Sequence, residues 1–210
     1  MTSKEFFKQY LKENFSQESL EVIGQFESYF DWLVSENQKI NLMSRKTDPE
    51  EIWSRHFADS LLATKFVNFS QSVILDFGTG GGFPGVPLAI LYPDSKVFLL
   101  DSRKKKINAL RDAVKVLGLK NCDFFDTRIE EVPPKYNGFF DIIVSRSVKI
   151  IPSYKKILFR LLKPSGKLVL YKSKILDDAE LFEKPEIHDT SSELIGERKI
   201  VVVNAKDFGA

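Results

Sequence analysis

Two aspartates that each follow an apolar run are the residues best placed to do chemistry in this sequence. Asp76 follows Val73-Ile74-Leu75 and precedes a glycine-rich stretch that ends at Gly85, and Asp101 follows Val97-Phe98-Leu99-Leu100. A carboxylate at the end of a buried strand, roughly 20 residues beyond a glycine-rich turn, can accept hydrogen bonds from ribose hydroxyl groups. The pattern indicates a site for a nucleoside-containing ligand, although Asp101 could instead cap the helix that follows it.

The spacing of the glycines decides between two kinds of nucleotide loop. A dinucleotide fingerprint, G-x-G-x-x-G, that starts at Gly78 puts its third glycine on Phe83, and one that starts at Gly80 reaches Gly85 only across Phe83-Pro84. An acidic residue, one spacer and G-x-G-x-G fits without a break, on Asp76, Gly78, Gly80 and Gly82. This arrangement resembles the S-adenosylmethionine (SAM) loop of Rossmann-like methyltransferases, in which glycines allow positive φ and a close approach of the ligand. Similar turns also occur in α/β proteins that bind other ligands or none.

Alternating strands and helices must position this loop. The apolar runs predict strands at 73–76, 97–101, 122–126, 140–145, 167–172 and 199–204, and helices at 85–91, 103–118 and 153–162. Residues 175–196 are expected to form a loop beside a short strand. Repeated strand–helix units favour one mostly parallel sheet with helices on both faces. We therefore expect an α/β, Rossmann-like SAM-dependent methyltransferase fold with a seven-stranded sheet that ends in an antiparallel strand.

The first 66 residues show helical rather than strand patterns. An amphipathic segment covers 3–14, a longer helix capped by Ser16 runs from Gln17 to about Asn37, a third helix starts at Asp48-Pro49 and reaches His56, and a fourth segment covers 58–66. We expect a helical N-terminal extension over residues 1–66 and a SAM-binding methyltransferase domain over residues 67–210, packed as one compact unit.

Composition excludes several classes of protein. The chain has 210 residues, of which 43% are hydrophobic and 29% charged, as in ordinary soluble domains. One cysteine, Cys122, excludes an internal disulfide and a cysteine-rich zinc site, and two histidines offer few metal ligands. No apolar window of about 18 residues occurs and the first residues lack a secretory h-region, so we expect no membrane span. We expect a cytoplasmic monomer without a metal site or a membrane partner.

The distribution of charge says more than the net charge of +2. Nine basic residues and no acidic residue lie in the segment 146–174, namely Arg146, Lys149, Lys155, Lys156, Arg160, Lys163, Lys167, Lys172 and Lys174. A second basic cluster is Arg103-Lys104-Lys105-Lys106. Such clusters suggest a polyanionic partner such as RNA, because neutralised phosphates give affinity that does not depend on sequence. The alternative is a solvated helix surface.

Further motifs accompany the glycine loop. They are Asn41-Leu42, Trp53-Ser54-Arg55-His56-Phe57-Ala58-Asp59-Ser60-Leu61, Leu100-Asp101-Ser102, Arg128-Ile129-Glu130-Glu131 and Ser145-Arg146-Ser147. From about residue 37 to residue 203, the combination resembles the bacterial small-subunit rRNA methyltransferase family once called glucose-inhibited division protein B. The resemblance implies methylation of nitrogen 7 of a guanine in 16S rRNA. It also implies SAM as the donor, S-adenosylhomocysteine as the product, and 16S rRNA or a small ribosomal subunit precursor as the partner.

The resemblance also implies roles for individual residues. The family's SAM contacts would fall on Gly78 and Phe83 of the loop, on Ile129 and Glu130, and on Arg146. The methyltransferase loop adds Asp76, Gly80 and Gly82 as cofactor-binding residues, and Asp101 is the ribose-side acid of the broader class. Lys105, Lys172 and Arg198 would face RNA, and Arg146 and Lys172 are the candidates for positioning the reactants. Arg146 could instead form an ion pair with Asp76 or Asp101, and Glu130 could be a helix-start carboxylate. Phe83 is either a core side chain or a wall beside the donor.

The implied chemistry needs no general base. Nitrogen 7 of guanine carries a lone pair and no proton at neutral pH, and the sequence lacks the Asn/Asp-Pro-Pro-aromatic motif that is used on exocyclic amines. We expect positioning and charge complementarity to carry the catalysis. His56 and Asp59, three residues apart, are expected to pack near the loop and to bind each other or the backbone. Two alternatives stay open, a small-molecule methyltransferase and a non-catalytic RNA-binding ribosome assembly factor, both on the same fold.

Overall fold

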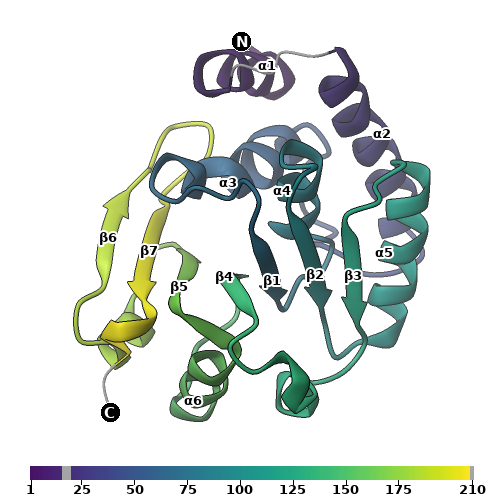
Figure 1. Cartoon of the computed structure of the whole chain (residues 1–210). Helices are drawn as coiled ribbons and strands as arrows, with labels where there is room; N and C mark the ends of the chain where they lie inside the picture. The colour runs from purple at the N-terminus through teal and green to yellow at the C-terminus, as the bar shows by residue number, and fades with distance from the viewer. Residues whose placement is uncertain (16–19, 209–210) are drawn as a thin grey trace.

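A seven-stranded sheet in the order β3-β2-β1-β4-β5-β7-β6 forms the centre of the structure (Figure 1). The computed structural model describes residues 1–15 and 20–208. The strands are β1 (Val73–Phe77), β2 (Lys96–Leu100), β3 (Cys122–Phe125), β4 (Phe140–Arg146), β5 (Leu162–Lys172), β6 (Glu186–Asp189) and β7 (Lys199–Asn204). Strands β1 to β5 run parallel, and β7 pairs antiparallel with β5 and β6. This confirms the predicted mostly parallel Rossmann-like sheet.

Helices cover both faces of the sheet because its central strands are apolar on both faces. In β1, Ile74 belongs to a core cluster that includes side chains of α4 (Gly85–Leu91) and α5 (Lys104–Val116). The next residue, Leu75, belongs to a second cluster on the other face, with side chains of α6 (Pro152–Leu161). Strands that are buried on both faces read as continuous apolar runs, which explains why β1, β2 and β4 were recognisable in the sequence.

The N-terminal helices pack against the same core as α4 and α5. They are α1 (Ser3–Asn14), which starts at a capping box between Thr2 and Glu5, and α2 (Leu20–Asn37). The buried side chains of Phe7 and Phe26 lie in one cluster with Ile74 of the sheet. The helix start expected at Ser16 and Gln17 lies outside the described residues.

Residues 51–65 form one helical run, and the two separate segments expected there are wrong. The run contains a π-helical turn at Trp53–Ala58, α3 (Asp59–Leu61) and a 3-10 turn at Leu62–Lys65. Nearly every residue from 52 to 63 is buried, so packing holds the backbone helical where the sequence shows no single period. None of the helices in the described ranges combines the length and hydrophobicity that a bilayer crossing requires.

Strand β5 begins five residues before the predicted start at residue 167. Phe140 of β4 pairs with Leu162, and Ile142 pairs with Lys167, so an irregular stretch of β5 lies between the two pairs. An insertion of this kind bends the strand without ending its pairing. The strand start could not be predicted from the sequence, because the apolar run begins only after the irregular stretch.

Candidate active site

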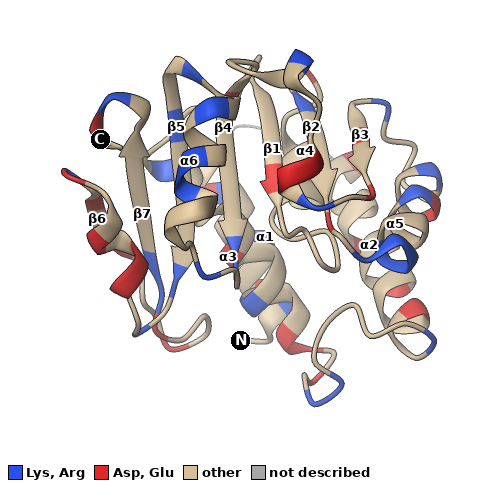
Figure 2. Cartoon of the chain, turned by 90° about the horizontal axis from the view of Figure 1, so that it is seen from below, with Lys and Arg blue, Asp and Glu red and all other residues tan. Residues whose placement is uncertain are grey.

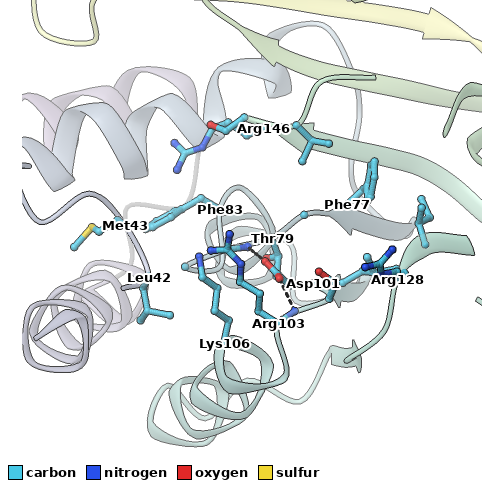
Figure 3. A pocket seen from close by; sticks show the side chains of 18 of the residues that line it. Leu42, Met43, Phe77, Thr79, Phe83, Asp101, Arg103, Lys106, Arg128 and Arg146 are labelled. Atoms are coloured by element: carbon cyan, nitrogen blue, oxygen red, sulfur yellow. Dashed lines mark hydrogen bonds between the residues drawn. The ribbon is translucent and has the colours of Figure 1, made fainter. Parts of the chain in front are cut away.

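A cleft of about 660 Å³ lies at the carboxyl ends of the central parallel strands, where the strand order reverses between β1 and β4 (Figure 3). Its volume falls within the range of roughly 300–1,000 Å³ that is usual for small-molecule sites. Ligands of open α/β sheets bind at this switch point, because the loops after the neighbouring strands diverge there. Seven of the predicted site residues line the cleft, namely Gly78, Gly80, Phe83, Asp101, Ile129, Glu130 and Arg146.

Asp76 holds the glycine loop from beneath and does not line the cleft, so its predicted direct contact with the cofactor is not supported. Its carboxylate is fully buried, and Oδ2 accepts hydrogen bonds from Thr79 Oγ1 at 2.6 Å and from the backbone of Gly85 at 2.8 Å. Burial raises the pKa of Asp76 to about 7, although both hydrogen bonds oppose the shift. The loop is also tied to β2, because Gly78 and Thr79 both donate to the carbonyl of Leu100 at 2.9 Å.

Gly78 and Gly82 need glycine for different reasons. Gly78 has a φ of +77°, and a Cβ there would lie 2.4 Å from Cγ2 of Val148 across the cleft. Gly82 has a φ of +95°, and its Cβ would lie 2.3 Å from the hydroxyl oxygen of Tyr29, which donates to the carbonyl of Gly81 at 2.5 Å. Gly82 is therefore required for packing against α2, and its predicted place in the ligand contact is not supported.

Asp101 lines the cleft but does not cap α5, because the N-cap residue of that helix is Arg103 and no side chain caps it, so the cap considered for Asp101 is wrong. Its Oδ1 accepts from the backbone N–H of Arg103 at 2.8 Å at the start of α5, and its Oδ2 accepts from Gly80 at 3.2 Å. The side chain is half-buried and lines the cleft. Since each carboxylate oxygen can accept a second hydrogen bond, Asp101 can hold the loop and still accept from a ligand hydroxyl.

The far wall of the cleft is a 3-10 turn, Ile129–Glu131, that follows β3. Ile129 is buried, whereas Glu130 is exposed and has no hydrogen bond or ion pair within the described ranges. The helix-start role considered for Glu130 belongs to Glu131, which accepts from the Thr127 hydroxyl and from the backbone of Arg128. Glu130 is thus free to bind a ligand.

Several lining residues were not assigned to the cofactor site from the sequence, although Arg103 and Lys106 belong to the basic cluster and Leu42 to a motif noted there. Arg103 and Lys106 extend from the start of α5 towards Asp101 (Figure 3), and burial lowers the pKa of Lys106. Leu42 and Met43 line the cleft from the loop after α2. The Asn41-Leu42 motif signalled this loop, but no local pattern showed that it reaches β1.

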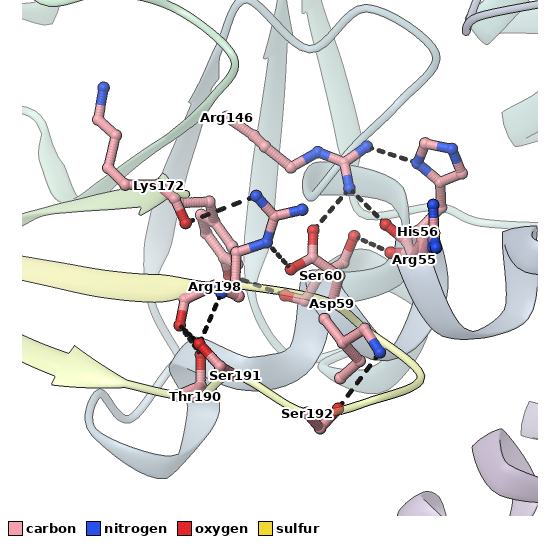
Figure 4. A network of polar contacts seen from close by, with 12 residues as sticks. Arg55, His56, Asp59, Ser60, Arg146, Lys172, Thr190, Ser191, Ser192 and Arg198 are labelled. Atoms are coloured by element: carbon pink, nitrogen blue, oxygen red, sulfur yellow. Dashed lines mark hydrogen bonds and ion pairs between the residues drawn. The ribbon is translucent and has the colours of Figure 1, made fainter. Parts of the chain in front are cut away.

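Arg146, at the end of β4, joins the cleft to a buried polar network (Figure 4). Its Nη1 contacts Asp59 Oδ2 at 2.9 Å and donates to the carbonyl of Arg55 at 3.3 Å, and its Nη2 lies 2.9 Å from His56 Nδ1. The ion-pair partners considered for Arg146, Asp76 and Asp101, are therefore wrong. The fully buried carboxylate of Asp59 takes this place, and its Oδ1 also pairs with Arg198 Nε at 2.6 Å.

Lys172 and Arg198 are mostly buried and held by ion pairs, so the structure gives no support to their predicted contact with RNA. Their side chains are 11% and 20% exposed, respectively. Lys172 forms an ion pair with the buried Asp178 and donates to the carbonyl of Val148 at 3.2 Å, which fixes the loop after β4. Buried carboxylates attract both cations inward. Lys105 is exposed, as expected.

Phe83 is packed as a core side chain, with 3% of its surface exposed, and it also lines the cleft. The ring of His56 stacks on it at a centroid distance of 4.8 Å, and Arg146 Cζ lies 4.9 Å from its centroid. His56 and Asp59 lie near the loop as expected, but both bind Arg146 rather than each other. Among the described residues, no three metal-binding side chains cluster.

Comparisons with known proteins agree with this geometry. The family model of rRNA small subunit methyltransferase G matches residues 22–199. Proteins named ribosomal RNA small subunit methyltransferase G are similar to this chain: that of Mesoplasma florum is 39% identical over 160 residues, which cover 76% of this chain and 67% of the relative. The relative from Clostridium novyi is 38% identical over 167 residues, which cover 78% of this chain and 68% of the relative. The matched region thus spans about two thirds of each relative's length.

Solved structures resemble this one at the level of the fold. A SAM-dependent methyltransferase from Aquifex aeolicus superposes with a TM-score of 0.60 and 18% identity, over 81% of this chain and 97% of the other. A SAM-dependent O-methyltransferase from Thermotoga maritima gives a TM-score of 0.58 and 14% identity, over 82% of this chain and 70% of the other. At such identities the likeness establishes the Rossmann-like methyltransferase fold alone.

Proposed function

The chain belongs to the rRNA small subunit methyltransferase G family, and on that premise we propose that it transfers a methyl group from SAM to nitrogen 7 of a guanine in 16S rRNA. The observation that carries the proposal is the cleft at the switch point of the sheet, with the glycine loop on one side and Arg146 on the other. S-adenosylhomocysteine is the second product. We further propose that the protein acts as a monomer on ribosomal RNA in the cytoplasm.

The residues of the cleft fit SAM in their chemistry. Gly78 and Gly80 have positive φ and present bare backbone, and a Cβ at Gly78 would collide with the side chain of Val148, which also lines the cleft. Asp101 keeps acceptor capacity for ribose hydroxyls, and Ile129 offers an apolar wall beside the free carboxylate of Glu130. When bound, SAM supplies a sulfonium methyl group that a lone pair can attack. Such preformed positions supply catalysis by orientation, an effect worth up to about 7–11 kcal/mol of barrier in favourable cases.

The end of the cleft next to β4 favours a nucleophile that carries no proton. Burial and the positive charges of Arg146, Arg198 and Arg55 lower the pKa of His56 to about 3, so its ring is neutral. Its Nδ1 already accepts from Arg146, and the carboxylate of Asp59 lies between two arginines. These groups are poorly suited to remove a proton, and nitrogen 7 of guanine does not require its removal.

Basic residues around the cleft support an RNA substrate. Arg45 and Lys46 lie between the lining residues Ser44 and Thr47, and Arg103 precedes the first residues of α5, Lys104 and Lys105. Within the described ranges none of these five has a carboxylate at ion-pair distance, so their charges are available to phosphates. Blue segments in Figure 2 mark lysines and arginines along α5 and on loops around the sheet.

Base-resolution mapping of methyl groups on rRNA tests the proposal. We expect one guanine of 16S rRNA to carry a methyl group at nitrogen 7 in cells with the protein and to lack it in cells without it. Label on an adenine or a cytosine would refute the nitrogen 7 assignment. Transfer to metabolites alone would favour a small-molecule enzyme, and a ribosome assembly defect without any loss of methylation would favour a non-catalytic factor.

A further inference from the structure

His56 is a cleft residue that the proposed transfer leaves without a role. It belongs to the π-helical turn Trp53–Ala58, is half-buried, and lines the cleft next to the end of β4. Its ring stacks on Phe83 with an interplanar angle of 24°. Stacking on one side and the arginine contact on its edge leave the imidazole little freedom to rotate.

The contact with Arg146 fixes which ring nitrogen of His56 carries the proton. A guanidinium group only donates hydrogen bonds, so Nδ1, 2.9 Å from Arg146 Nη2, must accept (Figure 4). The proton therefore sits on Nε2. Asp59 holds Arg146 in this position through its own ion pair at 2.9 Å. The low pKa of the ring, caused first by burial, keeps it neutral across the physiological range.

Within the described ranges, the N–H of Nε2 has no hydrogen-bond partner. Its nitrogen is also not sealed from solvent. His56 thus presents one neutral donor, in a fixed direction, on the wall of the cleft. A donor of this kind favours a ligand with an acceptor at that point and disfavours one with a donor, because the mismatch leaves polar groups unpaired.

We propose that His56 determines base specificity by donating a hydrogen bond from Nε2 to O6 of the target guanine. Guanine presents the acceptor O6 beside nitrogen 7, whereas adenine presents an amino donor at the same place. A neutral imidazole suits this role better than an imidazolium, since the base becomes a cation once nitrogen 7 is methylated. The inference rests on the proposed function and adds the residue that selects guanine.

The test removes O6 from the substrate rather than only the side chain from the protein. Small-subunit RNA is assembled with either guanine or 2-aminopurine at the mapped position, since 2-aminopurine keeps nitrogen 7 and lacks O6. For the wild-type protein we expect kcat/KM to fall by about 10-fold or more with 2-aminopurine. For His56→Leu we expect a similar loss on guanine and almost no further loss on 2-aminopurine.

Two further variants separate specificity from folding. His56→Gln keeps an amide N–H donor and is expected to recover part of the activity on guanine and part of the sensitivity to O6. His188→Gln changes the other histidine, which stacks on Phe66 and does not line the cleft, and is expected to behave as wild type. SAM affinity measured for each variant separates a loss of base recognition from a loss of the donor, and His188→Gln should bind SAM as wild type does. In the wild-type protein, nitrogen NMR should show His56 protonated on Nε2 alone from pH 5 to pH 8.

Each contrary outcome has a distinct meaning. If the wild-type protein methylates both RNAs equally, or if His56→Leu is as sensitive to the loss of O6 as wild type, the inference is wrong and the proposed function stands. A proton on Nδ1, or a titration midpoint near 6.5, would overturn the geometry on which the inference depends. If the wild-type protein places no methyl group on guanine, the proposed function fails first and the inference fails with it.

Discussion

Replacing Asp59 with asparagine removes the charge that holds two arginines together inside the protein. The Asp59 carboxylate is 0% exposed and contacts Arg146 at 2.9 Å and Arg198 at 2.6 Å. The arginine side chains are themselves 11% and 20% exposed, so the substitution leaves two mostly buried guanidinium groups without a counter-charge. Breaking a buried ion pair costs about 3–5 kcal/mol, against 0–1 kcal/mol for an exposed one.

The lower end of that range applies to Asp59→Asn, about 3 kcal/mol. Arg146 keeps its contacts with the carbonyl of Arg55 and with Nδ1 of His56, and both arginines keep some contact with water. Since domains of this kind are stable by about 5–15 kcal/mol, the variant should fold but lose a large part of its stability. Urea unfolding followed by circular dichroism measures the change, with the slope of the transition checked for constancy.

Two control variants bracket the effect of Asp59→Asn. Arg198→Met leaves Asp59 paired with Arg146, and we expect a loss of about 1–2 kcal/mol. Asp112→Asn breaks an exposed pair with Lys115, whose atoms are 3.7 Å apart, and we expect a change below about 0.5 kcal/mol. The reasoning would be refuted if Asp59→Asn were no more costly than Asp112→Asn.

Three further predictions follow from the loop, its buried carboxylate and the basic rim. Gly78→Ala should weaken SAM binding at least 10-fold in calorimetry, whereas Gly138→Ala, which has a similar positive φ but an open surrounding, should not; equal affinities would contradict the assigned close approach. Because the pKa of Asp76 rises from 3.8 to about 7 on folding, the native carboxyl keeps a proton that the unfolded chain loses between about pH 4 and pH 7. The contribution of Asp76 to the free energy of unfolding should therefore fall as the pH rises through that window. The urea midpoints of the wild-type protein and Asp76→Asn should then diverge with pH. Parallel plots of midpoint against pH would disprove the raised pKa. Lys105→Glu should weaken RNA binding and reduce the slope of log affinity against log salt concentration by about 1. The control is Lys120→Glu, at an exposed position before β3, which should change neither the affinity nor the slope.

The parts of the site that lie on one strand and its following loop could be predicted from the sequence. The turn after β1 needs positive φ at Gly78 and Gly80, and glycine is the residue that supplies it, so local chemistry revealed the loop. Asp101 ends the next strand, so it reaches the same edge of the sheet. Side-chain direction was harder: Asp76 lies within β1 and points beneath the loop rather than into the cleft.

The polar network could not be predicted, because its members are far apart along the chain. Asp59 and Arg146 are separated by 87 residues, and they meet only because the helical run 51–65 crosses the end of β4. Arg198 joins them because β7 runs antiparallel to β5 and brings its first residues to the same edge. Counting basic residues in a segment could not distinguish Lys172, paired with Asp178, from the exposed Lys105.

Single-turnover transfer of a labelled methyl group tests the central claim most directly. The purified protein is mixed with labelled SAM and small-subunit RNA or its ribosomal precursor particle, and the RNA is then digested to nucleosides and separated. If the glycine cleft presents the methyl donor to guanine, the label appears as 7-methylguanosine with the wild-type protein and is largely lost with Gly78→Ala. Label in any other nucleoside, or equal transfer by both proteins, would contradict it.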